Sequence, residues 1–86
     1  MTQKSKQLTF IDLFAGIGGF HLAFHNAGAK CVFTSEWDEF AQKTYRANFE
    51  KIEPDLFSSG NFVGDITEVD KNLIPDFDIL CAGFPC

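Results

Sequence analysis

Short apolar stretches alternate with amphipathic ones along this chain. Residues 8–14 are apolar and lie between a polar head and a glycine-rich tail, which predicts a β-strand. Residues 31–35 and 62–63 predict a second and a third strand by the same pattern. Residues 78–82 are nearly all apolar, which favours a fourth strand at the centre of the sheet, where both faces are covered.

Two helices are predicted between these strands. The first follows the glycine-rich turn and ends before Gly28, because glycine is favoured just after a helix. Its apolar positions recur at helical spacing and are Phe20, Ala23, Phe24 and Ala27. Asp38 is suited to cap the second helix. The inward positions expected on that helix are Phe40, Ala41, Thr44, Tyr45 and Phe49.

The rest of the chain carries weaker signals. Residues 50–61 combine Pro54 with charged, serine and glycine residues, which predicts a surface loop. Asp65 or Thr67 can cap a short helical turn that ends at Pro75. Strands that alternate with helices imply right-handed crossovers, so we expect an α/β fold of about four parallel strands with flanking helices. Residues 1–86 then form one domain or part of a larger one.

Composition excludes several classes of protein. Hydrophobic residues make up 45% and charged residues 22% of the chain, which is the balance of a globular protein. No apolar run approaches the roughly 20 residues of a membrane helix, and the polar N-terminus lacks the apolar core of a signal peptide. Three cysteines without a disulfide-framework spacing fit a reducing compartment. A cytoplasmic location without membrane contact is therefore expected.

The charge distribution argues against nucleic-acid binding by this stretch alone. The formal net charge is -5, and the seven Lys and Arg residues form no basic stripe that could neutralise phosphates. The chain also contains 11 phenylalanines, more apolar area than its few elements can cover. An uncovered strand edge and apolar helix-packing surface favour self-association of the isolated chain.

The first chemically distinctive feature is the glycine-rich turn after residues 8–14. Gly16, Gly18 and Gly19 lack Cβ atoms, so a ligand can approach the backbone, and the next helix begins with free N–H groups. The dinucleotide-binding pattern would place a third glycine at the position of His21. A tight turn with a structural purpose remains the alternative.

Glu36 follows the second predicted strand and stands 20 residues after Gly16 (36 minus 16). An acid about 20 residues after the first glycine is where a nucleotide ribose is held through its hydroxyls. An acid at a helix start, stabilised by the helix dipole, is the alternative. In combination with the turn, the ribose interpretation is favoured.

Trp37, Asp65 and Ile66 extend this interpretation to an adenine. The tryptophan can cover one face of the ring, the carboxylate can accept a hydrogen bond from the adenine amino group, and the isoleucine can pack on the other face. Alternatively, Trp37 belongs to the core and Asp65 caps a helical turn. The joint placement of the three at strand ends favours a bound adenosine.

Cys86 is the predicted reactive group. It follows Pro85 just after the fourth predicted strand, at the edge where ligands bind. A helix N-terminus or a nearby positive charge would lower the pKa of its thiol and so increase the fraction of nucleophilic thiolate. Cys31 and Cys81 are flanked by apolar residues and are expected in the core.

No metal site is predicted. Cys81 and Cys86 stand five residues apart without a second pair of ligands. His21 and His25 have i, i+4 spacing without a third ligand, and solvated histidines on a helix surface are the expected interpretation.

Four segments occur in a distinctive order: FIDLFAGIGG at 10–19, EWD at 36–38, GDIT at 64–67 and GFPC at 83–86. Together they resemble the N-terminal part of the DNA cytosine-5 methyltransferases, most closely the bacterial restriction-modification type. The resemblance extends over residues 8–86. It implies a Rossmann-like methyltransferase fold, present in part, with S-adenosyl-L-methionine as cofactor, and double-stranded DNA as partner of the full-length enzyme.

The resemblance also implies roles for single residues. The cofactor-binding set is Phe14, Gly16, Ile17, Gly18, Gly19, Glu36, Trp37, Asp65, Ile66 and Pro85. The glycine turn would lie beside the methionine end of the cofactor, and the aromatic and acidic residues beside its adenosine. Cys86 would be the catalytic nucleophile. Its thiolate would add to cytosine C6 and so make C5 able to take the methyl group from the cofactor. The target base would be flipped out of the duplex.

The family continues beyond the nucleophile with a DNA-closing loop, a base-protonating glutamate, a target-recognition domain and a last helix. Residues 1–86 are therefore expected to be a truncated part of the catalytic domain, without methyltransferase activity of its own. A non-catalytic adenosine-binding or interaction domain is the second hypothesis. A nicotinamide-dependent oxidoreductase is the third, but the missing third glycine and the presence of Pro85 and Cys86 argue against it.

Overall fold

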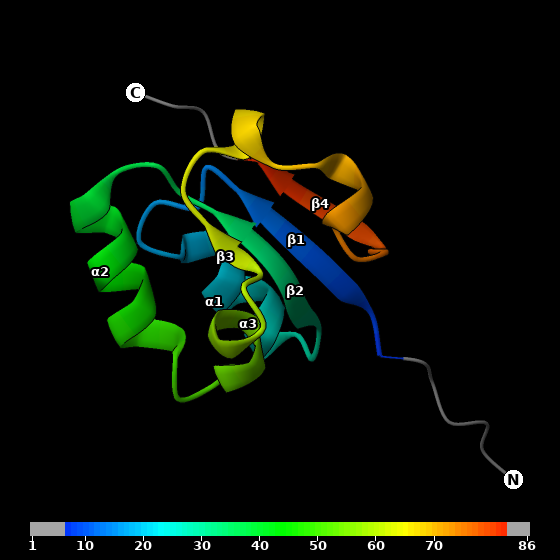
Figure 1. Cartoon of the computed structure of the whole chain (residues 1–86). Helices are drawn as coiled ribbons and strands as arrows, with labels where there is room; N and C mark the ends of the chain where they lie inside the picture. Colours follow the sequence, from blue (N-terminus) through cyan, green and yellow to red (C-terminus); the bar gives the residue numbers. More distant parts are fainter. Residues whose placement is uncertain (1–6, 83–86) are drawn as a thin grey trace, which may run out of the picture.

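The structure, a computed structural model, describes residues 7–82 as a four-stranded parallel sheet with helices packed against it (Figure 1). The strands are β1 (Thr9–Leu13), β2 (Lys30–Ser35), β3 (Phe62–Val63) and β4 (Ile79–Ala82). The helices are α1 (Gly19–Asn26), α2 (Glu39–Phe49) and α3 (Pro54–Ser58), with two 3-10 turns, η1 (Ile66–Glu68) and η2 (Lys71–Leu73). The predicted α/β fold with parallel strands is confirmed.

The strand order β3-β2-β1-β4 reverses direction between β1 and β4. Right-handed crossovers place the helices between β1, β2 and β3 on one face, and the returning connection from β3 to β4 on the other (Figure 1). Leu13 lies opposite both Ser35 and Ala82, so the carboxyl ends of these three strands are level. Open sheets of this kind bind ligands at such a reversal point.

Local signals set the ends of the two longer helices. Gly28 has a φ of 94°, and it and the next residue donate to carbonyls of the last turn of α1 in the Schellman arrangement. The Asp38 carboxylate accepts a hydrogen bond of 2.8 Å from the backbone N–H of Ala41, which caps α2 as predicted. Both boundaries could be predicted because each depends on residues close in sequence.

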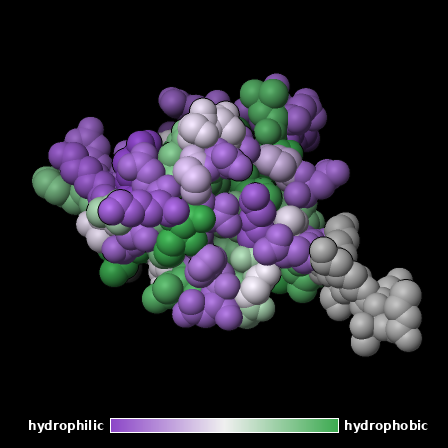
Figure 2. Space-filling view, turned by 90° about the horizontal axis from the view of Figure 1, so that it is seen from below, coloured by the Kyte–Doolittle hydropathy of each residue, from purple (hydrophilic) through white to green (hydrophobic). Residues whose placement is uncertain are grey.

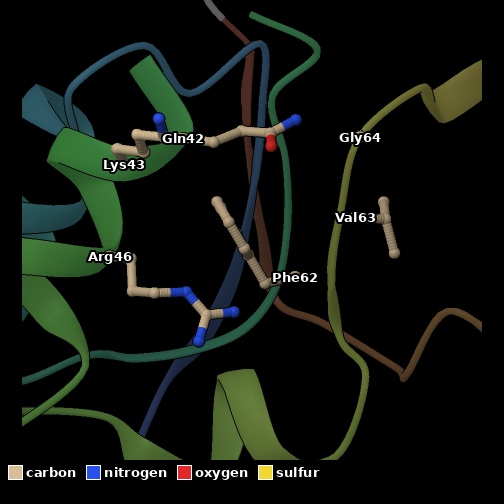
Figure 3. A pocket seen from close by; sticks show the side chains of 6 residues that line it. All are labelled: Gln42, Lys43, Arg46, Phe62, Val63 and Gly64. Atoms are coloured by element: carbon tan, nitrogen blue, oxygen red, sulfur yellow. The ribbon is translucent and has the colours of Figure 1, made fainter. Parts of the chain in front are cut away.

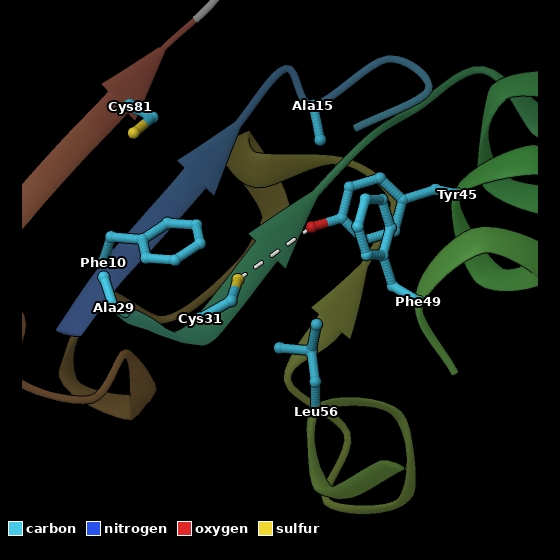
Figure 4. Packing of buried hydrophobic residues seen from close by; sticks show 8 residues of the cluster. All are labelled: Phe10, Ala15, Ala29, Cys31, Tyr45, Phe49, Leu56 and Cys81. Carbon is cyan, nitrogen blue, oxygen red and sulfur yellow. Dashed lines mark hydrogen bonds between the residues drawn. The ribbon is translucent and has the colours of Figure 1, made fainter. Parts of the chain in front are cut away.

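The core lies between the sheet and the helices (Figure 4). Its buried members are Phe10, Ala15, Ala29, Cys31, Tyr45, Phe49, Leu56 and Cys81. The rings of Tyr45 and Phe49 lie together beside the sheet, with centroids 4.8 Å apart. Cys31 and Cys81 are free buried thiols, as predicted, and burial raises the pKa of Cys31 to about 11.

Two predictions about the second half of the chain are wrong. The expected loop at residues 50–61 contains α3, which begins at Pro54 and buries Leu56 in the core. Proline fits the first turn of a helix, so it starts this helix rather than preventing one. Within the described residues β4 lies at the sheet edge and not at its centre, and Leu80 is 55% exposed. The apolar sequence of β4 therefore did not predict its position in the sheet correctly.

Several residues at the predicted inward positions of α1 and α2 are exposed instead, and Phe20 and Phe40 are the largest of them. Phe40 is 79% exposed, because it stands five positions before buried Tyr45, and at about 3.6 residues per turn this spacing places it off the buried face of α2. Phe20 is 47% exposed, since α1 turns His21 and Phe24 toward the sheet. Apolar patches remain among the polar surface residues (Figure 2). Self-association through such surface stays a prediction.

Candidate functional site

A hollow of about 280 Å³ lies where the polypeptide leaves β1, β2 and β3. Its lining residues are Phe14, Ser35, Glu36, Trp37, Gly64, Asp65, Ile66 and Thr67. All five residues predicted for an adenosine are among them. The volume is near the lower limit of the roughly 300–1,000 Å³ of small-molecule sites, and we call this hollow the strand-end pocket.

Glu36 joins the pocket to the glycine turn. Its Oε1 accepts a hydrogen bond of 2.7 Å from the backbone N–H of Gly16, and its Oε2 accepts one of 2.9 Å from the N–H of Asp38. The first bond gives the 20-residue spacing a structural reason. A carboxylate has about four acceptor positions, so both oxygens can still accept hydrogen bonds from a ligand.

Gly16 and Gly18 of the glycine turn lack a side chain for different structural reasons. A Cβ at Gly18 would lie 2.1 Å from the Phe49 ring, and its φ is +101°, so packing alone excludes a side chain there. Gly16 has a φ of +60°, and no atom lies within 4 Å of the position that a Cβ would take. The structural interpretation of the turn therefore holds for Gly18, whereas Gly16 leaves room for a ligand.

The predicted cofactor residues do not all line one hollow. Ile17, Gly18 and Gly19 line a second one of about 310 Å³, together with residues of α1, α2 and Ile52. The turn is held in place by Asn48, whose Nδ2 donates to the Ile17 carbonyl at 3.2 Å. The hydrogen bond from Gly16 to Glu36 connects the turn to the strand-end pocket.

Phe14 lines the strand-end pocket, and its backbone is strained. Its φ of 54° lies in the left-handed region, which costs a non-glycine residue roughly 1–2 kcal/mol. Such strain persists only where the surroundings fix it, and it is common at ligand sites. Phe14 is 44% exposed, so its ring is available at the pocket.

Trp37 and Asp65 decide between the alternatives left open by the sequence. Trp37 is 76% exposed, so it is not a core residue. Asp65 does cap η1: its Oδ1 accepts hydrogen bonds from Thr67 N at 2.9 Å and Thr67 Oγ1 at 2.7 Å. These bonds lower the pKa of Asp65, which is therefore ionised at neutral pH. Among the described residues both bonds use Oδ1, which leaves Oδ2 as a further hydrogen-bond acceptor.

Pro85 and Cys86 lie outside the described residues. The structure describes β4 up to Ala82, which pairs with Leu13 at the end of β1. The predictions for the two residues therefore rest on the sequence alone.

The sequence did not single out a buried polar cluster beneath the glycine turn. Asp12 and His21 are 0% exposed, and the Tyr45 hydroxyl lies within hydrogen-bond reach of both. The expectation of a solvated His21 is wrong, because its ring stacks on Phe49 with centroids 3.8 Å apart. An aspartate within an apolar strand was the available signal, since a buried carboxylate needs specific partners.

Burial shifts the two titratable groups in opposite directions. Burial raises the pKa of Asp12 from 3.8 to about 7. The hydrogen bond from Tyr45 lowers this pKa, and repulsion from Glu36 raises it further. Burial, with a contribution from His25, lowers the pKa of His21 from 6.5 to about 4. Asp12 Oδ1 and His21 Nε2 have no hydrogen-bond partner among the described residues. Both groups are therefore disfavoured in their charged forms.

These shifts predict two opposing pH dependences of stability. Between pH 4 and 6.5 the folded state holds a proton on Asp12 that the unfolded chain has released, so this group lowers stability as pH rises. Over the same range the unfolded chain holds a proton on His21 that the folded state lacks, which raises stability. Relative to the parent, Asp12→Asn should add a positive slope and His21→Gln a negative slope, each up to about 1.4 kcal/mol per pH unit. Urea unfolding at several pH values measures both, and slopes parallel to the parent would contradict the assignment.

A third hollow, of about 240 Å³, lies between α2 and β3 (Figure 3). It is lined by Gln42, Lys43, Arg46, Phe62, Val63 and Gly64. Arg46 already pairs with Glu50 at 2.8 Å and lies over the Phe57 ring at 5.0 Å. The hollow shares Gly64 with the strand-end pocket, and no residue predicted for the cofactor lines it.

Residues 7–82 contain neither a membrane-crossing helix nor a group of metal-ligating side chains. None of the helices described there has the length and apolar character needed to cross a membrane. In the same part of the chain, no three His, Cys, Asp or Glu side chains are grouped so that they could hold a metal ion.

Comparison with known proteins points to one family. The family model for the C-5 cytosine-specific DNA methylases matches residues 8–86. Type II methyltransferase M.HhaI of Haemophilus parahaemolyticus is 56% identical over 87 residues, which cover 96% of this chain and 24% of that protein. Type II methyltransferase M.HpaII of Haemophilus parainfluenzae is 59% identical over 83 residues, 94% of this chain and 21% of that protein. Type II methyltransferase M.BsuFI of Bacillus subtilis is 54% identical over 81 residues, 93% of this chain and 17% of that protein.

The chain thus spans about a quarter or less of the length of these relatives. The matched part contains the strand-end pocket and the glycine turn, together with the segment that carries Pro85 and Cys86.

Proposed function

Because the chain belongs to the C-5 cytosine-specific DNA methylase family, we propose that it forms the cofactor-binding part of a DNA cytosine-5 methyltransferase. A methyl donor is implied by the family, and we propose S-adenosyl-L-methionine. The observation that carries this proposal is the strand-end pocket. Three separate strand ends bring together the aromatic, acidic and aliphatic side chains that an adenosine needs.

The residues of the strand-end pocket fit the parts of an adenosine. Glu36 has acceptor positions left over for the two ribose hydroxyls. Phe14 and Trp37 offer exposed ring faces to the adenine, and Ile66 offers an apolar surface. Asp65 Oδ2 can accept a hydrogen bond from the adenine amino group.

The glycine turn suits the remainder of the cofactor. The backbone of Gly16 is bound to Glu36, and no atom lies where its side chain would be, so the methionine end can continue from the ribose past this residue. The N-terminus of α1 begins directly after the turn and offers unpaired N–H groups to a carboxylate.

Cys86 would carry out the covalent step. Its thiolate would add to C6 of a flipped cytosine, which would make C5 nucleophilic enough to take the methyl group that the bound donor would supply. Loss of the proton from C5 would then reform the double bond between C5 and C6 and expel the thiolate. Burial raises the pKa of Cys31 and Cys81, which makes them unsuitable for this role.

Titration of the protein with S-adenosyl-L-methionine tests the proposal, with Trp37 as the reporter. The chain has one tryptophan, and it lines the strand-end pocket. The donor should change its fluorescence in a saturable way, whereas NAD should not. Saturable binding of NAD in place of the methyl donor would favour the oxidoreductase hypothesis instead. In the full-length protein that carries this chain, donor binding without methyl transfer to any duplex DNA would favour the non-catalytic hypothesis.

Asp65 offers a matched test of adenine recognition. Asp65→Asn keeps an oxygen that can cap η1 and replaces Oδ2 by an NH2 group, which cannot accept a hydrogen bond from the adenine amino group. We expect cofactor affinity to fall on the order of tenfold. Asp70 caps η2 through the same bond, from Asn72 N at 2.9 Å, and does not line the pocket. Asp70→Asn should therefore leave the affinity unchanged, and equal affinities for the two variants would refute the role of Asp65.

A further inference from the structure

One buried hydroxyl connects three elements beneath the strand-end pocket. Tyr45 of α2 is 0% exposed, and its hydroxyl lies 2.9 Å from Thr34 Oγ1 on β2. It also contacts His21 Nδ1 on α1 and lies 3.5 Å from Asp12 Oδ2 on β1. A tyrosine hydroxyl can donate one hydrogen bond and accept others, so it can serve these three partners, while Cys31 Sγ lies farther from it at 3.9 Å (Figure 4). We call Tyr45 and these three partners the Tyr45 cluster.

Two partners lie on strands that lead directly into pocket residues. Asp12 on β1 stands two residues before Phe14, which follows the strand, and Thr34 on β2 stands two residues before Glu36, which follows that strand. A shift of either strand would move the pocket residue that follows it. Phe14, with its left-handed backbone, depends most on fixed surroundings.

The third partner supports the glycine turn from below. The His21 ring stacks on Phe49 with centroids 3.8 Å apart and planes 9° apart. Phe49 in turn occupies the space beside Gly18. Tyr45 itself packs on Phe49 with centroids 4.8 Å apart (Figure 4).

We propose that Tyr45 is a positioning residue for the cofactor pocket, whose hydroxyl fixes the strand ends that carry Phe14 and Glu36 without touching the cofactor. This inference rests on the proposed function. It adds that the affinity for the methyl donor depends on a hydrogen bond outside the pocket.

The proton arrangement of the cluster gives the inference a distinctive signature. With Asp12 ionised, Tyr45 donates to Asp12 and accepts from Thr34 and from the N–H at His21 Nδ1. With Asp12 protonated, the hydrogen bond between Tyr45 and Asp12 joins two neutral groups and is weaker than a bond to the carboxylate. The bond that ties α2 to β1 is therefore strongest when Asp12 is ionised.

The hydrogen bond from Tyr45 on α2 lowers the pKa of Asp12, and repulsion from Glu36, just after β2, raises it. The other titratable groups around the cluster are Cys31 on β2, Cys81 opposite Asp12 on β4, and His21 on α1. Burial raises the pKa of Asp12 to about 7, so both arrangements are populated at neutral pH. The hydrogen bond from Tyr45 opposes that rise.

Measurement of S-adenosyl-L-methionine affinity across neutral pH tests the inference in the parent protein and in Tyr45→Phe. Parent affinity should increase with pH, with its midpoint near pH 7, where Asp12 is half ionised, and should level off at higher pH as the ionisation becomes complete. Tyr45→Phe should bind on the order of tenfold more weakly. Its pH midpoint should also move upward, because the variant loses the hydrogen bond that favours the ionised carboxylate.

Two further variants keep the test decisive. Phe57→Leu alters a ring 6.3 Å from the Tyr45 ring without removing a hydroxyl, so it should leave the pH midpoint in place. Asp12→Asn preserves the shape of the carboxylate and should flatten the pH dependence, which tests the inference even if Tyr45→Phe fails to fold. Parent-like affinity and midpoint in Tyr45→Phe would overturn the inference, as would an effect no different from that of Phe57→Leu. A parent protein without affinity for the methyl donor at any pH would refute the proposed function itself.

Discussion

Replacement of Cys86 by serine in the protein that carries this chain is expected to abolish methyl transfer to DNA. Serine can occupy the same space, but at neutral pH it supplies no thiolate to add to cytosine C6, so the rate should fall by about a thousandfold or more. Affinity for S-adenosyl-L-methionine should stay within about twofold of the parent, since the strand-end pocket does not need the sulfur. Transfer of a labelled methyl group to duplex DNA and equilibrium binding of the donor measure the two quantities.

Cys81→Ala is the matched control for this prediction. It removes a buried thiol that stands five residues earlier in the sequence, and it should retain methyl transfer. A Cys86→Ser protein with the parent's rate would leave only a binding function for this chain. Loss of donor affinity together with activity would show that the residue acts in binding rather than in covalent catalysis.

Gly18→Ala is expected to cause the largest loss of stability among single substitutions in the glycine turn. The new Cβ would lie 2.1 Å from Phe49 Cε2, and the φ of +101° disfavours any residue with a Cβ. Overpacking and left-handed strain together should cost about 3 kcal/mol. The midpoint of urea unfolding should fall accordingly, and donor affinity should fall with it because the turn is bound to Glu36.

Gly19→Ala provides the comparison. No atom lies within 4 Å of a Cβ at Gly19, which is the first residue of α1, so alanine should be neutral or slightly stabilising there. Equal losses of stability in the two variants would contradict the steric role of Phe49 and would indicate a general intolerance of the turn.

Features determined by neighbouring residues could be predicted from the sequence. The strands were visible as short apolar stretches, and the ends of α1 and α2 followed from Gly28 and Asp38. The capping alternative for Asp65 was available for the same reason, because its partner Thr67 is two residues away. Each of these features depends on a few consecutive residues and hardly on the rest of the fold.

Features determined by distant contacts could not be predicted in this way. His21 is buried because the rings of Tyr45 and Phe49 receive it, 24 and 28 residues later in the chain. Leu56 gives α3 its place in the core, which its mixture of proline, charged and serine neighbours did not suggest. The apolar sequence of β4 predicted a central strand, but strand order depends on pairing and not on composition.

In the candidate site, too, the positions along the strands could be predicted from the sequence, whereas the side-chain packing could not. The sequence placed Phe14, Glu36, Trp37, Asp65 and Ile66 at strand ends, and a parallel sheet necessarily brings such ends to one edge. It could not show that the glycine turn lines a separate hollow, nor that Gly18 is required by a phenylalanine 31 residues away. These details depend on side-chain packing across α1 and α2.

A crystal structure of the protein with bound S-adenosyl-L-homocysteine tests the central claim most directly. The ribose hydroxyls should lie within hydrogen-bond distance of the Glu36 carboxylate, with the adenine between Trp37 and Ile66 and its amino group directed to Asp65. An adenosine bound elsewhere, for example in the hollow beside Lys43 and Arg46, with the strand-end pocket filled only by water, would contradict the account.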